Sequence, residues 1–154
     1  MKKLLFLLLL VLAAYLLWRW WRSDAEVARG QELFYDRLWV DHLPQNETDT
    51  IEVMAAVTEE PMGIFVATSN WRGSYELFRW QARGDGRVAL SFPQSGKREE
   101  ARYRAWKCNE RSFQYCLEIS GSSHGVRRYY SLEEWEIGSR SIAEAKKDVQ
   151  KLLH

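Results

Sequence analysis

Residues Ala101–Ser120 read ARYRAWKCNERSFQYCLEIS, two alternating runs separated by a short polar turn. In the first run small or aromatic residues alternate with arginines. In the second run the apolar residues fall at every other position, namely Phe113, Tyr115, Leu117 and Ile119. Successive side chains of a β-strand point to opposite faces, so a period of two is typical of strands. The segment therefore predicts an antiparallel hairpin with one buried and one wet face.

The same pattern recurs on both sides of this hairpin, with turn-forming residues between the runs. The expected strands are Leu38–Leu43, Thr50–Thr58, Ile64–Ser69, Ser74–Ala82, Arg87–Phe92, Ala101–Lys107, Phe113–Ser120 and Val126–Ser131. Short strands joined by short turns, without helical segments between them, indicate an antiparallel meander. We therefore expect a mostly β fold, in which about eight strands close into a small barrel. In Thr50–Thr58 the buried face is expected to be Ile51, Val53, Ala55 and Val57.

The segment 1–22 differs from the rest of the chain. Lys2 and Lys3 precede an apolar run from Leu4 to Leu17, and Trp18 and further aromatic and basic residues follow it. A basic start before an apolar run is typical of an export signal. The bulky residues Tyr15–Leu17 are a poor cleavage context, and the tryptophans and arginines after them prefer the headgroup layer, which favours an uncleaved anchor. Placing the larger folded part outside favours an N-terminus in the cytoplasm. A cleaved signal peptide is the alternative, and a buried helix is a third reading.

Two further segments are expected to be helical. Ser23 and Glu26 have the spacing of a capping box, so residues 23–35 are read as a helical spacer. Ser141 and Glu144 repeat this spacing before an apolar stripe, which predicts a C-terminal amphipathic helix. The chain is thus divided into the leader 1–22, the spacer 23–35 and a barrel-like domain 36–154.

The charge distribution argues against a nucleic-acid partner. All 21 acidic residues but only 18 of the 22 basic residues lie after position 22, so this part carries 18 − 21 = −3. Binding to nucleic acid needs a basic face that replaces counterions. We therefore expect no nucleic acid among the partners.

Cys108 and Cys116 flank the turn of the hairpin. If they lie opposite each other, paired positions sum to 224, which places Lys107 opposite Leu117 and both cysteines on the wetter face beside Trp106. The apolar positions then share one face, so the hydrophobic pattern and the cysteine pairing agree. In an exported domain we expect a disulfide, with two free thiols as the alternative. A metal site is not favoured, because other metal ligands are missing at the required spacing.

The sequence gives no pattern typical of an enzyme, and we expect neither catalysis nor a cofactor. Asp41 and His42 are neighbours in an expected strand, which would point them to opposite faces. Ser123 and His124 are neighbours in an expected turn, and a nucleophile and its base must meet in space. A structural role is the prediction for each histidine.

Aromatic and basic residues form two clusters that could bind a partner or ligand. The candidates are Trp71 and Arg72 in one expected turn, and Arg127, Arg128, Tyr129 and Tyr130 near the last strand. Exposed Trp, Tyr and Arg dominate the energetics of many protein interfaces. The alternative is that these rings fill or cap the barrel with arginines stacked over them.

Four segments, Asp36–Pro44, Phe92–Gly96, Tyr115–Glu118 and Arg128–Ser131, resemble an uncharacterised group of exported or membrane-anchored bacterial proteins. The resemblance extends from Asp36 to Ile137 and implies a bacterial envelope location, without an activity. The meander with its C-terminal helix also resembles calycin barrels such as lipocalins, although their Gly-x-Trp opening is missing here.

We therefore expect an envelope protein at the inner membrane with its domain outside the cytoplasm, or in the periplasm if the leader is cleaved. The expected function is non-catalytic: the domain binds a protein partner or supports an assembly. The alternative function is a lipocalin-like carrier or sensor that holds a small apolar ligand inside the barrel.

Overall fold

The computed structural model describes residues 11–18, 30, 32–46, 48–69 and 72–137. Residues 11–18 form a helix whose side chains are all exposed, with Leu12, Leu16 and Trp18 each more than half exposed. In the part of the chain described here, no helix is both long and apolar enough to span a membrane. From residue 30 onward the regular secondary structure of the described chain is mostly β-strand.

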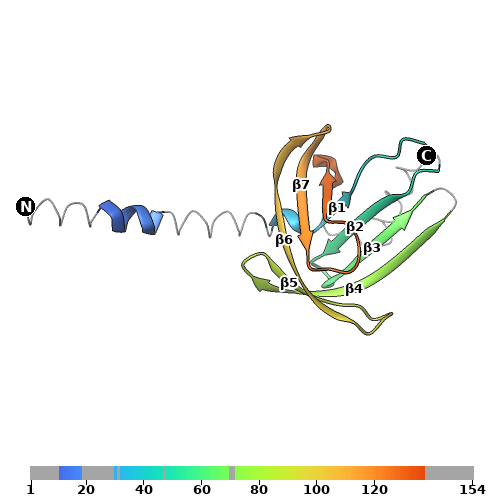
Figure 1. The fold of residues 1–154 in the computed structure, drawn as a ribbon, viewed down its shortest axis with the longest axis horizontal. Helices are drawn as coiled ribbons and strands as arrows, with labels where there is room; N and C mark the ends of the chain where they lie inside the picture. The colour runs from blue at the N-terminus through green and yellow to red at the C-terminus, as the bar shows by residue number, and fades with distance from the viewer. Residues whose placement is uncertain (1–10, 19–29, 31, 47, 70–71, 138–154) are drawn as a thin grey trace, which may run out of the picture.

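Eight antiparallel strands form a closed barrel in sequence order (Figure 1). They are β1 Arg37–Val40, β2 Ile51–Val57, β3 Met62–Thr68, β4 Gly73–Gly84, β5 Arg87–Ser91, β6 Arg98–Glu110, β7 Phe113–Ser120 and β8 Arg128–Ser131, followed by a short 3-10 helix, Glu133–Trp135. Closure is made by β1 and β8, where Val40 pairs with Tyr130. The predicted fold class is confirmed, and each expected strand is present: β7 has the predicted bounds, and the others are shifted at one or both ends.

The inside of the barrel is filled by a core to which every strand contributes. The largest fully buried side chains in this core are Trp39, Met54, Phe78, Phe92, Leu117 and Tyr129. Phe78 is in ring contact with Phe65 at 4.8 Å and with Phe92 at 6.2 Å between centroids. A barrel of this strand number is just wide enough for side chains to fill, and here aromatic rings fill it.

The chain just before β1 closes one end of the barrel. Phe34 stacks on Tyr103 at 4.2 Å, and Tyr35 stacks on Trp80 at 4.1 Å. The indole N–H of Trp39 donates to the Phe34 carbonyl at 3.0 Å, so its buried polar atom is satisfied. This arrangement fixes the entry of the polypeptide into the barrel.

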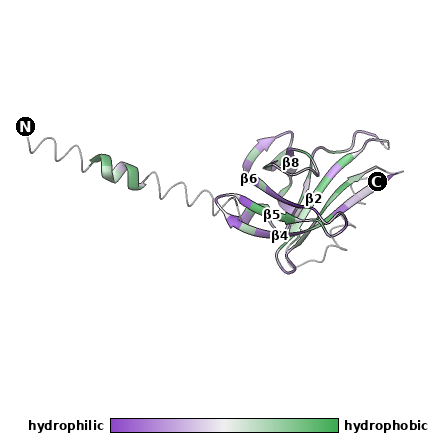
Figure 2. Ribbon diagram, turned by 60° about the horizontal axis from the view of Figure 1, so that its bottom comes forward, coloured by the Kyte–Doolittle hydropathy of each residue, from purple (hydrophilic) through white to green (hydrophobic). Residues whose placement is uncertain are grey.

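The second cluster lies on the outer wall of β1, β2, β7 and β8. It contains the odd-numbered residues of β2, which the sequence pattern assigned to the buried face of that strand. These residues are buried, but the opposite face of β2 is not exposed to solvent either. Met54 and Ala56 are fully buried inside the barrel, so the prediction of one wet face is wrong for β2. Figure 2 shows hydrophobic colour along β2 and hydrophilic colour on much of β4 and β6.

The predicted disulfide is present, with a Cys108–Cys116 S–S distance of 2.06 Å and Cα atoms 5.7 Å apart. The predicted register is wrong by two residues. Trp106, rather than Cys108, lies opposite Cys116, because a bulge between Lys107 and Glu110 shifts the pairing. A shift by two keeps every side chain on its face, so the assignment of faces survives. Cys116 is fully buried, which corrects the expectation of a wet face around it.

The two predicted terminal helices are described only in part. Within the spacer 23–35, residue 30 and residues 32–34 are helical. The predicted C-terminal helix that begins near Ser141 lies outside the described residues.

Candidate functional site

The outer wall over β6, β7 and β8 carries a tryptophan between two arginines. The guanidinium carbons of Arg104 and Arg128 lie 5.2 and 5.4 Å from the Trp106 ring centroid. Both distances are within the range of a cation–π interaction. Trp106 remains partly exposed. We refer to Arg104, Trp106 and Arg128 as the Trp106 cluster.

Ion pairs and the disulfide hold this cluster in place. Arg128 donates to Glu110 at 2.6 Å and lies 3.7 Å from Glu118, so carboxylates on two strands fix its guanidinium. Trp106 is paired with Cys116, whose disulfide ties β6 to β7 beside the ring. A surface whose side chains are already ordered loses less entropy when it binds. The Trp106 cluster is therefore a preorganised surface.

The structure separates the residues predicted as a binding patch. Arg127 is exposed in the loop between β7 and β8, whereas Arg128 is on the outer wall in the Trp106 cluster. Tyr129 is fully buried inside the barrel, and Tyr130 is buried in the outer cluster with 6% of its surface exposed. Tyr129 therefore faces away from the arginines beside it in sequence, whereas the guanidinium carbon of Arg128 lies over the buried Tyr130 ring, 5.7 Å from its centroid. Their placement agrees with the alternative that they fill and cap the barrel.

The other predicted patch lies at the turn between β3 and β4. Arg72 is exposed there, and Trp71 lies outside the described residues. Sequence reasoning did not single out Arg104 and Trp106 as binding residues. Their signal was available, because both occupy the outward positions of the alternating run that begins at Ala101. Alternation gives the face of a residue but not its neighbours on other strands.

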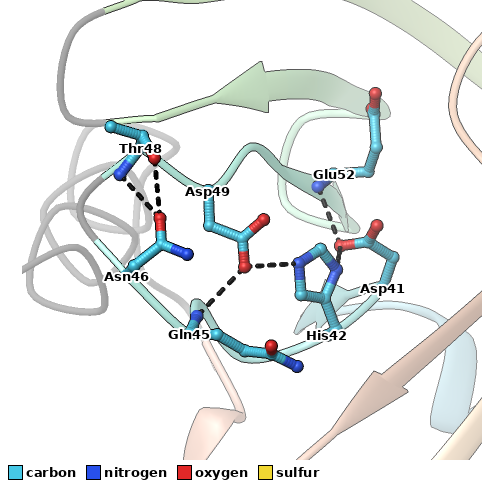
Figure 3. Close-up of polar contacts among 7 residues, drawn as sticks. All are labelled: Asp41, His42, Gln45, Asn46, Thr48, Asp49 and Glu52. Carbon is cyan, nitrogen blue, oxygen red and sulfur yellow. Dashed lines mark hydrogen bonds and ion pairs between the residues drawn. The ribbon is translucent and has the colours of Figure 1, made fainter.

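A polar cluster lies at the barrel end opposite Phe34 and Tyr35, in the loop between β1 and β2 (Figure 3). His42 is bracketed by two carboxylates: its Nδ1 lies 2.9 Å from Asp41 Oδ1, and its Nε2 lies 3.1 Å from Asp49 Oδ2. The sequence-based expectation that Asp41 and His42 point to opposite faces is wrong, because β1 ends at Val40 and the alternation stops there. The backbone N–H of Glu52 also donates to Asp41, at 2.9 Å.

Both ring nitrogens of His42 face carboxylates that only accept hydrogen bonds, which favours a doubly protonated ring. Burial lowers the pKa of His42, but the hydrogen bonds and charges of Asp41 and Asp49 outweigh it and raise the pKa overall. The pKa of Asp49 is lowered, chiefly by the backbone N–H of Gln45 and with a further contribution from His42. An imidazolium with both nitrogens occupied has no free position for proton transfer. The geometry therefore supports a structural clamp on this loop.

Glu52 faces the interior next to this clamp. Burial raises the pKa of Glu52, and the charge of Asp41 raises it further. Burial also raises the pKa of Tyr129, whose hydroxyl accepts the backbone N–H of Val126 at 2.9 Å. Tyr129 is thus a neutral phenol that joins the interior to the loop between β7 and β8.

That loop carries the remaining histidine of interest. His124 packs on Phe92 with ring centroids 4.4 Å apart, while Ser123 donates to Glu99 through both its backbone N–H and its hydroxyl. Within the described residues His124 Nε2 has no hydrogen-bond partner. Ser123 is therefore bound to a carboxylate rather than to an imidazole base. A pocket of about 260 Å³ lies against the loop, lined by Ile119–Ser122 and His124–Arg127.

The described residues hold no group of three or more His, Cys, Asp or Glu side chains placed to bind a metal ion. The pocket is also smaller than the roughly 300–1,000 Å³ typical of small-molecule sites. Comparison of the chain with models of known protein families, with characterised proteins and with solved structures gives no match.

Proposed function

We propose that this chain is a non-catalytic protein of the bacterial envelope, tethered by its N-terminal segment, whose barrel binds a protein partner through the Trp106 cluster. The observation that carries the proposal is the partly exposed Trp106 ring between Arg104 and Arg128 on a cross-linked wall. Trp and Arg are the residue types most enriched among the side chains that dominate binding energy. Such anchors bind best when they are ordered before the partner arrives.

One feature supports a location outside the cytoplasm, and a second supports the membrane tether. The Cys108–Cys116 disulfide persists where the environment is oxidising. The helix 11–18 exposes Leu12, Leu16 and Leu17, which is unfavourable in water and favourable in a bilayer. We place the chain at the inner membrane with the barrel outside the cytoplasm, or in the periplasm if the leader is removed.

A lipocalin-like carrier of a small apolar ligand is the alternative function, and the eight-stranded antiparallel barrel is compatible with a calycin-like architecture. A carrier needs an interior cavity. Here Trp39, Phe78 and Phe92 occupy the interior and are buried to within 1% of complete. The filled interior is the reason we favour recognition on the outer surface.

The proposal is tested with the full chain, purified gently from membranes, by photo-crosslinking from Gln114, an exposed residue on β7. Trp106→Ala should reduce cross-linking to the partner about 30-fold or more, the effect of losing a 2 kcal/mol hot spot. Tyr75→Ala is the matched control, because it removes an aromatic ring that is 62% exposed on β4. Arg127→Ala tests the second exposed candidate in the same assay.

Unfolding of each variant must be measured alongside. If Trp106→Ala lowers stability by about 3 kcal/mol or more, as removal of a buried aromatic does, its effect on capture has a structural cause. Equal losses of cross-linking in Trp106→Ala and Tyr75→Ala would contradict a specific role of the Trp106 cluster.

A further inference from the structure

A second wall of the barrel, over β4, β5 and β6, carries four outward arginines. Arg79 and Arg98 are both paired with Ser91, one on each side of it, and Arg102 is paired directly with Arg87. Paired residues of antiparallel strands share a face, so the four side chains lie on one side of the sheet. We call Arg79, Arg87, Arg98 and Arg102 the arginine wall.

Two carboxylates compensate the four arginines of this wall only in part, and one of them, Glu100, lies on the same face of β6 between Arg98 and Arg102. Arg87 has two acidic neighbours, Glu100 at 3.5 Å and Asp85 at 3.9 Å. Among the described residues Arg79, Arg98 and Arg102 have no ion-pair partner. Like charges directly opposite each other on neighbouring strands destabilise a sheet, and Arg87 and Arg102 are placed in this way. The arrangement therefore favours an anionic surface that neutralises it from outside.

The shape of the wall favours a flat anionic partner over a compact one. Three neighbouring strands span about 10 Å across the sheet, and the four residue steps from Arg98 to Arg102 cover about 13 Å along β6. The pocket described above is lined by residues of β7 and of the β7–β8 loop, and none of the four arginines lines it. The planar guanidinium group binds phosphate oxygens through two parallel hydrogen bonds. A layer of phospholipid headgroups presents phosphates in this way.

The position of the tether brings the wall within reach of such a layer. A Cβ placed on Gly30 would lie 3.1 Å from the Ala105 carbonyl oxygen, so the incoming chain passes against β6. From Trp18 to Gly30 there are 30 − 18 = 12 residues, which reach about 40 Å when fully extended. We propose that the arginine wall lies on anionic phospholipid headgroups and orients the barrel on its side at the bilayer. The inference rests on the membrane tether of the proposed function.

This orientation leaves the partner surface accessible. β5 is at the centre of the arginine wall and β7 is at the centre of the Trp106 cluster. In a closed barrel of eight strands these two strands are a quarter of the circumference apart. The Trp106 cluster then faces along the membrane plane, where a partner in the same membrane can meet it.

The test uses the full chain in nanodiscs of phosphatidylcholine alone or of phosphatidylcholine mixed with phosphatidylglycerol. Arginines are modified with phenylglyoxal and the labelled peptides are quantified by mass spectrometry. Labelling of Arg98 and Arg102 should fall at least about threefold in the anionic discs, because each basic residue near an anionic surface strengthens the binding to that surface about fivefold. High salt should restore the labelling. Arg72, exposed in the turn between β3 and β4 and seven residues before Arg79, is the internal control.

A paired variant, Arg98→Gln with Arg102→Gln, should remove the lipid-dependent protection of Arg79. Equal labelling of the wall in both kinds of disc would overturn the inference while leaving the tether intact. Protection by added polyglutamate with none from phosphatidylglycerol would assign the wall to an acidic protein and also overturn it. A chain that is not retained in either disc would contradict the tether, and the inference with it.

Discussion

Replacing Phe78 by alanine tests whether the barrel interior is filled. Phe78 is 1% exposed, lies between Phe65 and Phe92, and covers Gly63, which has no side chain to move into the gap. Removal of a buried phenylalanine costs about 3–5 kcal/mol. Two aromatic contacts are lost with it, each worth about 0.5–1.5 kcal/mol in addition to the buried apolar area. We therefore expect the free energy of unfolding to fall by about 4 kcal/mol.

The assay is urea unfolding of the full chain in a mild detergent, followed by near-ultraviolet circular dichroism. Tyr75→Ala on the same strand is the control and should change stability by less than about 0.5 kcal/mol, because its ring is on the outer surface. The new apolar cavity should bind benzene, so benzene should stabilise the Phe78→Ala variant and not the unmodified chain. Two results would refute the filled interior and favour the carrier function. One is equal stabilisation of both proteins by benzene, and the other is a loss of unfolding free energy below about 1.5 kcal/mol in Phe78→Ala.

Two further predictions concern the disulfide and the loop clamp. Replacing Cys108 and Cys116 together by serine should lower the free energy of unfolding by about 2–3 kcal/mol, because the disulfide closes a short loop. Urea unfolding measures this loss. As an internal check, the variant should be as stable as the unmodified protein after its disulfide has been reduced. The folded-state pKa of His42 is raised, so its contribution to stability is fully present below its unfolded pKa of about 6.5 and is lost as pH rises through the folded value. His42→Gln should flatten this part of the stability–pH curve, and an unchanged pH dependence in the variant would show that His42 is not its cause.

The strand alternation and the cysteine spacing were sufficient to predict the β-architecture and the cross-link. Each depends on local rules: a period of two within a strand, turn residues between strands, and a short hairpin that brings Cys108 near Cys116. The predicted register failed by two residues because β6 has one residue more than β7 between the pairs Lys107–Tyr115 and Glu110–Phe113. The predicted and the observed pairings nevertheless have the same parity in the rest of the hairpin. Whether a residue occupies an odd or an even position identifies the face on which its side chain lies. This assignment does not change when the pairing register shifts by two residues.

The candidate sites depended on contacts between strands that are distant in sequence. Arg128 and Trp106 meet only because β7 pairs with both β6 and β8. Tyr129 and Tyr130 are identical neighbours in sequence, yet one faces the filled interior and the other the buried outer wall. The sequence alone determined that the chain forms alternating strands with a disulfide hairpin. Which apolar face points inward, and which charged residues share a wall, was decided by barrel closure, because closure alone determines what lies on each side of the sheet.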